Sequence, residues 1–103
     1  MIGLAKSTAL LMARHNVTCN AVCPTLVKTK LLDNDYVLGA LSPDNPSFEA
    51  FDAVARTIHP MPVGFYEPVR VGEAVRFLCS EGAALISGEV VDIGAGANAR
   101  FNA

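Results

Sequence analysis

Tryptophan is absent from this sequence, and charged residues make up only 17% of its 103 positions. No run of five or more basic residues occurs, and the formal net charge of -2 provides no attraction for a nucleic acid. No apolar stretch approaches the roughly 18–20 residues that span a bilayer, and the short apolar run between Lys6 and Arg14 lacks a convincing cleavage site. We therefore expect a cytoplasmic protein that binds neither nucleic acid nor membrane.

Cysteine is scarce and odd in number, with three residues in the chain. Cys19 and Cys23 fall in one predicted extended segment, where four residues at about 3.3 Å each place the two sulfurs too far apart for a disulfide. Neither a CxxC spacing nor a nearby histidine cluster is present, although these are the usual ligand patterns for zinc. The cysteines are expected to be reduced thiols, and no metal site is predicted.

Apolar residues are what the sequence has in quantity, at 51% of the chain. This composition predicts a globular domain with a hydrophobic core. A chain of this length is expected to bury roughly 60–65% of the surface that its unfolded form exposes, which leaves only modest stability.

Residues 2–14 are predicted to form a helix, because they contain no proline and no glycine after Gly3. The segment ends in Arg14, and His15 follows, which suits the negative end of a helix dipole. Its apolar residues occupy more than one face. They are Ile2, Leu4, Ala5, Ala9, Leu10, Leu11, Met12 and Ala13. Such a helix needs other elements packed against it on more than one side. Its large aliphatic residues Ile2, Leu4, Leu10 and Leu11 risk exposure as an apolar patch.

Two further helices are predicted next to prolines that suit a first helical position. One begins near Asn45 with Pro46, and the other spans 67–80 with Pro68 near its start and Gly82 as its stop. Both carry apolar residues at helical spacing. The stripes are Phe51, Val54, Ala55 and Ile58 in the first, and Val71, Ala74, Val75 and Leu78 in the second.

Residues 17–23 and 89–93 are short and rich in residues that suit a pleated surface, and Gly88 can turn the chain into the second segment. We predict two strands, with 17–23 buried on both faces as in a parallel sheet. Two helices lie between the strands, which predicts a crossover connection. Between Lys28 and Pro46 no regular pattern is visible, and we expect a long excursion outside the scaffold. Two strands do not make a sheet that is stable by itself.

The glycine-rich tail 94–99 formally matches a dinucleotide fingerprint. Only four residues follow it, too few for the helix that would face a pyrophosphate, so we expect a flexible or partner-packed terminus instead. His15 and His59 are the candidates for a general base by residue type. Neither has a nucleophile motif beside it, and helix-end or turn roles are expected for both.

The candidate site is the segment Asn20–Thr29, because ligands in open α/β sheets bind beyond the carboxyl ends of the strands. The segment is a predicted strand end followed by a proline, then by hydroxyl and backbone groups. The alternative, favoured by composition alone, is an ordinary turn from strand to loop.

Three ordered motifs carry a resemblance to the short-chain dehydrogenase/reductase family. Val17–Pro24 followed by Thr29 resembles the family segment RVNxVxPGxVxT. The stretch from His59 through Ser80 is similar to the family's P…EPEEVAxAVxFLAS helix, and Ile86–Gly96 is similar to its YITGxxxxVDGG end. The resemblance implies an incomplete Rossmann-type fragment, a doubly wound parallel sheet with about three helices and two short parallel strands. Residues 1–103 would form the C-terminal part of one such domain.

The resemblance also implies a function and a site. Family members use NAD or NADP to interconvert a small-molecule alcohol and its carbonyl compound, and are usually homo-oligomers. By this likeness, Pro24, Thr25, Val27 and Thr29 would bind the cofactor, with the backbone of Val27 at the carboxamide. Leu31, Leu32 and the substrate-lid excursion 33–58 would face the substrate. The family usually has glycine in place of Thr25. The tail and this threonine most resemble the mycofactocin-dependent, carveol dehydrogenase-like branch.

The family's glycine-rich loop, catalytic serine and Tyr-x-x-x-Lys pair correspond to sequence upstream of Met1. Tyr36 and Tyr66 do not replace that tyrosine, because neither has a lysine four residues later and both fall in loop-like regions. We therefore expect an oxidoreductase fragment with no catalytic residue of its own, inactive and without bound cofactor when alone. The alternatives are an assembly module that pairs with full-length family subunits, and a decayed gene fragment without function.

Overall fold

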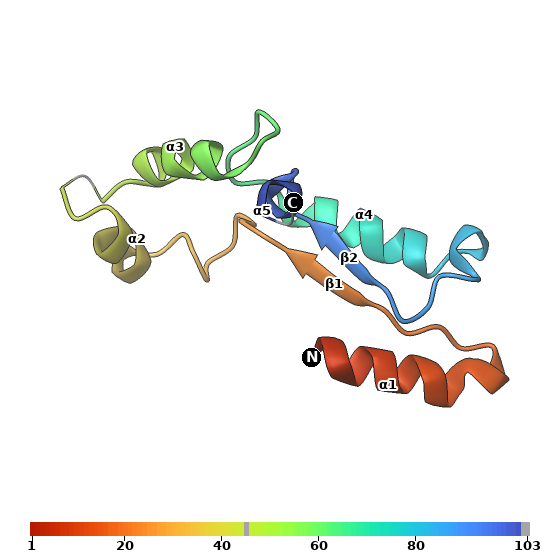
Figure 1. Ribbon diagram of the computed structural model, residues 1–103. Coiled ribbons are helices and arrows are strands. Elements are labelled where there is room, and N and C mark those ends of the chain that lie inside the picture. Colours follow the sequence, from red (N-terminus) through yellow and green to blue (C-terminus); the bar gives the residue numbers. More distant parts are fainter. Residues whose placement is uncertain (45, 102–103) are drawn as a thin grey trace. The chain divides into compact units, whose positions relative to one another are not determined.

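The computed structural model describes residues 1–44 and 46–101 (Figure 1). Its α-helices are α1 (Ile2–Met12), α2 (Asp35–Leu41), α3 (Phe48–Ile58), α4 (Pro68–Leu78) and α5 (Ala97–Phe101). The strands are β1 (Ala21–Pro24) and β2 (Val90–Ile93), and the 3-10 turns are η1 (Ala13–His15) and η2 (Glu81–Ala83).

The chain divides into two compact units. The first unit contains Met1–Pro24 and Val71–Ile93, and therefore α1 and both strands. The second unit contains Thr25–Arg70 and the residues from Gly94 onward, and therefore α2, α3 and α5. The candidate site falls mainly in the second unit, which begins directly after β1.

The two strands pair in parallel, with Ala21 opposite Val90 and Pro24 opposite Ile93. Parallel pairing with helices in the connection confirms the predicted α/β fold class. β1 is shorter than predicted, and residues 17–20 lie outside it. There the Gly88 amide donates to the Cys19 carbonyl at 2.8 Å. The side chain of Asn20 adds two links to the segment before β2: its Nδ2 donates to the Ile86 carbonyl at 2.9 Å, and its Oδ1 accepts from the Glu89 amide at 3.1 Å.

The prediction that the first strand is buried on both faces is wrong for this structure. Within the predicted segment 17–23, Ala21 is buried but Val17 is 45% exposed, and β2 alternates between exposed and half-buried residues. The sheet has two strands within the described residues. Each strand therefore has one neighbour in the sheet, and too few elements surround it to bury both of its faces.

The first and last long helices agree well with the sequence patterns. α1 and η1 together span the predicted 2–14 segment, and α4 begins at Pro68 as expected. α4 ends at Leu78, however, and Gly82 lies in η2, so the prediction that Gly82 stops this helix is wrong. The Ser80 hydroxyl donates to the Phe77 carbonyl at 2.6 Å and satisfies a C-terminal group of the helix before the glycine is reached.

The central helix begins later than predicted. Ser47 is the N-cap of α3, and its hydroxyl accepts from the Ala50 amide at 3.2 Å. Pro46 lies before this cap and is not the first helical residue, because a serine hydroxyl satisfies an unpaired helix amide and a proline cannot. Asn45, the other predicted start, lies outside the described residues.

Two short helices add to the predicted three. α2 lies within the segment expected to lack scaffold elements, and its N-cap Asn34 accepts from the Val37 amide at 3.0 Å. Tyr36 is therefore helical and not in a loop, whereas Tyr66 is in a loop as predicted. α5 forms within the tail, where the Ala97 amide donates to the Gly94 carbonyl at 2.8 Å. This part of the tail is therefore helical, and the prediction of a flexible or partner-packed terminus stays a prediction.

The buried core is small. Its apolar members are Ala9, Ala21, Leu38, Phe51, Ala55, Ala83 and Ala97. The predicted stripe of α3 is partly buried, since Phe51 and Ala55 are inside while Val54 and Ile58 are exposed. No residue of the α4 stripe is buried. On α1 the predicted exposure is confirmed, since Ile2, Leu4, Leu10 and Leu11 all face solvent.

Candidate functional site

The residues predicted to bind a cofactor follow one another at the end of β1. Pro24 is the last residue of the strand, and Thr25, Val27 and Thr29 lie in the loop that opens the second unit. Val27 is half-buried, and the other three residues are exposed. The structure thus keeps these residues at an accessible surface beyond the carboxyl end of a parallel strand, where ligands of α/β sheets bind.

Val27 is held by a parallel bridge to Tyr66. The Tyr66 amide donates to the Leu26 carbonyl at 3.1 Å, and the Lys28 amide donates to the Tyr66 carbonyl at 2.9 Å. In a parallel pair of this kind, the residue between two bonded neighbours turns its own N–H and C=O to the opposite side. The Val27 backbone therefore presents one donor and one acceptor away from Tyr66.

Thr25 is held by two side chains from distant parts of the second unit. Its backbone N–H donates to the Tyr66 phenol oxygen at 2.9 Å, and its hydroxyl lies 2.8 Å from His59 Nε2. The same hydroxyl is 3.5 Å from the Tyr66 phenol oxygen. Tyr66 consequently fixes this loop twice, through its backbone beside Val27 and through its phenol beside Thr25.

His59 is buried, with 3% of its surface exposed. Its backbone N–H donates to the Ala55 carbonyl at 3.2 Å as the C-cap of α3, which confirms the predicted helix-end role. Its ring is also engaged at both nitrogens, because Nδ1 lies 3.0 Å from the Val63 carbonyl and Nε2 faces Thr25. A buried imidazole with both nitrogens bonded has a defined orientation.

The loop between α3 and Tyr66 is pinned by Asp52. This carboxylate accepts from the Phe65 amide at 2.7 Å and from Arg56 Nε at 3.0 Å. Gly64 is buried beside it, and a Cβ atom added there would overlap the Asp52 carboxylate. The Phe65 ring contacts Phe51 edge-on, with ring centroids 4.7 Å apart. These contacts fix the path of the chain from His59 to Tyr66.

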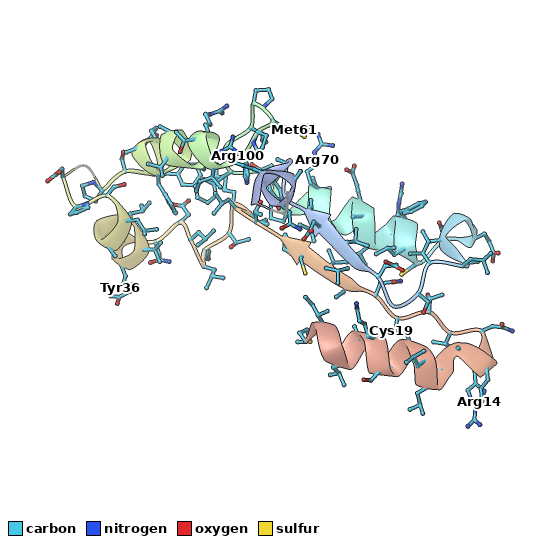
Figure 2. The ribbon with its side chains drawn as sticks, viewed as in Figure 1. Arg14, Cys19, Tyr36, Met61, Arg70 and Arg100 are labelled. Carbon is cyan, nitrogen blue, oxygen red and sulfur yellow. The ribbon has the colours of Figure 1, made fainter. Side chains whose placement is uncertain are left out.

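The tail packs on the same loop. The Met61 amide donates to the Ala95 carbonyl at 3.0 Å, and Gly96, at φ +88, has Pro60 so close that a Cβ would lie 3.2 Å from its ring. Arg100 of α5 donates to the Thr57 carbonyl at the end of α3 at 3.0 Å. Figure 2 labels Arg100 and Met61, which belong to these contacts.

The predicted substrate residues lie just after the cofactor residues. Leu31 is 78% exposed, and Leu32 is half-buried. They belong to a turn in which the Leu32 and Asp33 amides donate to the Thr29 carbonyl, at 3.0 and 2.8 Å. Tyr36 of α2 is also exposed, and Figure 2 shows its side chain projecting outward from that helix. Apolar surface is therefore available along this stretch.

Two residues of the site, His59 and Tyr66, were not predicted as part of it. They lie 34 and 41 positions from Thr25, and no local spacing connects them. The only sequence signal is the resemblance of the His59–Ser80 stretch to a family motif, which assigns no role to either side chain.

Other functional signals are few in the described part of the chain. Cys19, Cys23 and Cys79 are free thiols, as expected. Residues 1–44 and 46–101 contain no group of three metal-binding side chains. In the same residues, no helix has both the length and the apolar character needed to span a bilayer.

Comparison with known proteins supports one family. A family model described as enoyl-(acyl carrier protein) reductase matches residues 1–98. A (-)-trans-carveol dehydrogenase of Rhodococcus erythropolis is 37% identical over 98 residues, which are 93% of this chain and 35% of that protein. A putative short-chain type dehydrogenase/reductase of Mycolicibacterium smegmatis is 34% identical over the same proportions of the two chains. The chain thus spans about a third of the length of these relatives.

Solved structures give the same result. The structure of carveol dehydrogenase from Mycobacterium avium in complex with NAD has a TM-score of 0.90 and 30% identity, covering 95% of this chain and 36% of that one. The actinorhodin polyketide ketoreductase F189W with NADPH has a TM-score of 0.77 and 28% identity, covering 93% of this chain and 36% of that one.

Proposed function

Because this chain belongs to the short-chain dehydrogenase/reductase family, we propose that it forms one wall of the nicotinamide site of an NAD- or NADP-dependent oxidoreductase. The complete enzyme would interconvert a small alcohol and its ketone. Two relatives of known structure have NAD or NADPH bound, which supports this cofactor class.

The observation that carries the proposal is the orientation of Val27. Its N–H and C=O are turned away from Tyr66, whose backbone bonds go to Leu26 and Lys28. A carboxamide group carries one acceptor and two donor hydrogens, so it can pair with a peptide N–H and C=O at once. The Val27 backbone fits that group and would hold the nicotinamide by its carboxamide.

The neighbouring residues would complete the wall. Pro24 and Thr25 are exposed and have rigid backbones, the first by its ring and the second by its bond to Tyr66. The Thr29 hydroxyl would reach the carboxamide or a phosphate. Leu31 and Leu32 offer apolar surface to an alcohol. A nicotinamide cofactor, when bound, supplies the hydride chemistry, and the residues of this chain bind and orient it.

Proton transfer in this reaction needs an acid that Pro24, Thr25, Val27 and Thr29 do not supply. Residues four positions after the two tyrosines are Ala40 and Arg70, and neither is the lysine of a Tyr-x-x-x-Lys pair. We propose that the tyrosine and lysine belong to the part of the relatives' length that this chain does not match. The same proposal places the complete enzyme in the mycofactocin-dependent, carveol dehydrogenase-like branch of the family. The enzyme would be a homo-oligomer located in the cytoplasm.

Sequencing the DNA upstream of the Met1 codon tests the proposal first. We expect an in-frame Tyr-x-x-x-Lys segment and a glycine-rich turn between a strand and a helix, and stop codons in all of that region would contradict it. The complete protein, once expressed, should bind reduced nicotinamide cofactor in a fluorescence titration. The 103-residue chain alone should not.

Val27→Pro then tests the wall itself. Proline removes the Val27 N–H and leaves both bonds of the Tyr66 bridge in place. We expect cofactor affinity of the complete protein to fall about tenfold, the effect of losing one good hydrogen bond. Val27→Ala keeps the N–H and should bind as the parent does. Equal affinity in the proline and alanine variants would show that the Val27 amide does not hold the cofactor.

A second candidate function is an assembly module, and the exposed apolar residues of α1 favour it. Leu4, Leu10 and Leu11 are 65%, 82% and 70% exposed, which is unusual for large aliphatic side chains on one helix. In this role the chain would pair with full-length family subunits without turnover. Co-purification with such a subunit, abolished by lysine at positions 10 and 11, is the expected result. Failure of the pair to co-purify would remove this candidate.

A further inference from the structure

The hydrogen bond between Thr25 and His59 has a defined direction. The Val63 carbonyl can only accept, so His59 Nδ1, 3.0 Å away, carries the proton. In the neutral imidazole Nε2 is then an acceptor, and the Thr25 hydroxyl at 2.8 Å must donate to it. The hydroxyl proton of Thr25 therefore points toward the buried ring and not toward a ligand.

Both branches of the Thr25 side chain are directed to residues of its own unit. The hydroxyl lies at His59, and the methyl group lies beside Gly94, where an added Cβ would be 3.3 Å from Thr25 Cγ2. A β-branched side chain has three staggered rotamers, and these two contacts fit one of them. The other rotamers would separate the hydroxyl from the imidazole.

His59 is itself immobilised. It is buried, it caps α3, and the residue after it, Pro60, packs on Gly96. Its ring cannot follow Thr25 into another rotamer without leaving the Val63 carbonyl, and a buried N–H without a partner costs about 1–3 kcal/mol. The imidazole is thus a fixed acceptor placed behind the exposed loop.

From these contacts we propose that His59 is a positioning residue, which turns the Thr25 side chain inward so that the loop backbone can approach the nicotinamide ring. This inference rests on the proposed function and adds a residue to it. It assigns no proton transfer to His59. It also accounts for a threonine at a position where close approach of a flat ring would otherwise favour glycine.

The direction of the hydrogen bond can be measured in the 103-residue chain, which has only two histidines. With 15N-labelled histidine, the His59 signals should show a protonated Nδ1 and an unprotonated Nε2, while exposed His15 serves as the reference. Assignment follows from the loss of one set of signals in His59→Gln. A protonated Nε2, whether or not Nδ1 is also protonated, would overturn the proposal, because Nε2 would then donate to Thr25.

The consequence for binding is tested with matched variants of the complete protein. His59→Asn keeps a donor for Val63 but cannot reach Thr25, whereas the longer amide of His59→Gln can place its oxygen near the position of Nε2. We expect cofactor affinity to fall about tenfold in His59→Asn, the effect of one lost hydrogen bond, and to stay within about threefold in His59→Gln.

Thr25→Gly provides the decisive background, because it removes the side chain that His59 would position. In Thr25→Gly, His59→Asn should no longer change cofactor affinity. If it still weakens binding tenfold, His59 acts through general stability and the proposal is wrong. Normal binding in His59→Asn alone would also refute it while leaving the proposed function intact. No binding by the parent protein would instead remove the proposed function, and the positioning role with it.

Discussion

The two units of this chain are built in different ways. In the first unit the buried apolar residues are alanines, namely Ala9, Ala21 and Ala83, and its large aliphatic side chains on α1 are exposed. The second unit buries Leu38, Phe51 and the imidazole of His59. Burial of large side chains contributes most of the hydrophobic free energy of folding. The second unit therefore has the stronger interior, although the regular sheet belongs to the first.

Polar contacts follow the same division. In the first unit, the side chains of Asn20 and Ser87 join the segments before the two strands. In the second unit, Asp52, His59 and Tyr66 each join segments distant in sequence. Apart from Pro24, the candidate cofactor wall thus belongs to the unit that is internally better fixed, as expected for a surface that must orient a ligand.

Removing a buried ring should show the largest difference between the units. Phe51→Ala deletes a side chain that is 6% exposed and its edge-on contact with Phe65, and should lower the free energy of unfolding by about 3 kcal/mol. Phe77→Ala, in the first unit, removes a side chain that is 53% exposed and should change it by less than about 1 kcal/mol. Urea denaturation measures both. Similar losses would mean that the two interiors do not differ.

Two glycine-to-alanine substitutions should change the free energy of unfolding in opposite directions. Gly64→Ala forces a methyl group into the Asp52 carboxylate and should destabilise the chain by about 1–3 kcal/mol. Gly72→Ala, in α4, meets no atom within 4 Å and should stabilise the chain by about 0.5–1 kcal/mol through helix propensity. Thermal unfolding compares the two variants. A tolerated Gly64→Ala would show that the loop before Tyr66 is not tightly held.

The Asn20 link should have an intermediate effect. Asn20→Ala removes the hydrogen bond that the side chain donates to Ile86 and the one that it accepts from Glu89. It should lower the free energy of unfolding by about 1–2 kcal/mol. Asn20→Asp keeps the acceptor for Glu89 and should lose less. Hydrogen exchange of the Glu89 amide should accelerate in the alanine variant only. Unchanged exchange there would show that the first unit does not depend on this side chain.

Lysine on the exposed face of α1 should have the smallest effect on stability. Leu10→Lys with Leu11→Lys changes two exposed side chains and should shift the free energy of unfolding by no more than about 0.5 kcal/mol each. The same change should lower self-association, because the apolar patch is interrupted. Sedimentation velocity at several concentrations gives the measurement. Undiminished self-association would show that the apolar patch of α1 is not the surface through which the chains associate.

Several elements could be predicted because their determinants are local. Proline at position 68 begins α4, and the uninterrupted run of good helix formers in 2–14 gives α1 and η1. α2 had a local signal too, since Asn34 followed by Asp35 is typical of a helix start, but the charged and glycine-containing surroundings obscured it. The stop of α4 was missed because Ser80 supplies a partner before Gly82 does.

The site was predictable only in part. Position after a strand indicated the segment Asn20–Thr29, and the family resemblance then named Pro24, Thr25, Val27 and Thr29 within it. The structure leaves three of these residues exposed and Val27 half-buried. Nothing in the spacing indicated that His59 and Tyr66 would bond to Thr25, because their separation along the chain is bridged by two helices and a loop. Such contacts depend on the path of the backbone, which is a property of the fold.

The sequence by itself determined the family and the parallel α/β class, and it predicted the loop after β1 as the candidate site, because motifs and periodicity are properties of neighbouring residues. Only the tertiary structure decided which groups of that loop are available. The bridge to Tyr66 turns the Val27 peptide groups outward, and the buried His59 turns the Thr25 hydroxyl inward. Hydrogen-bond direction depends on partners brought together in space, and these partners lie far apart along the chain.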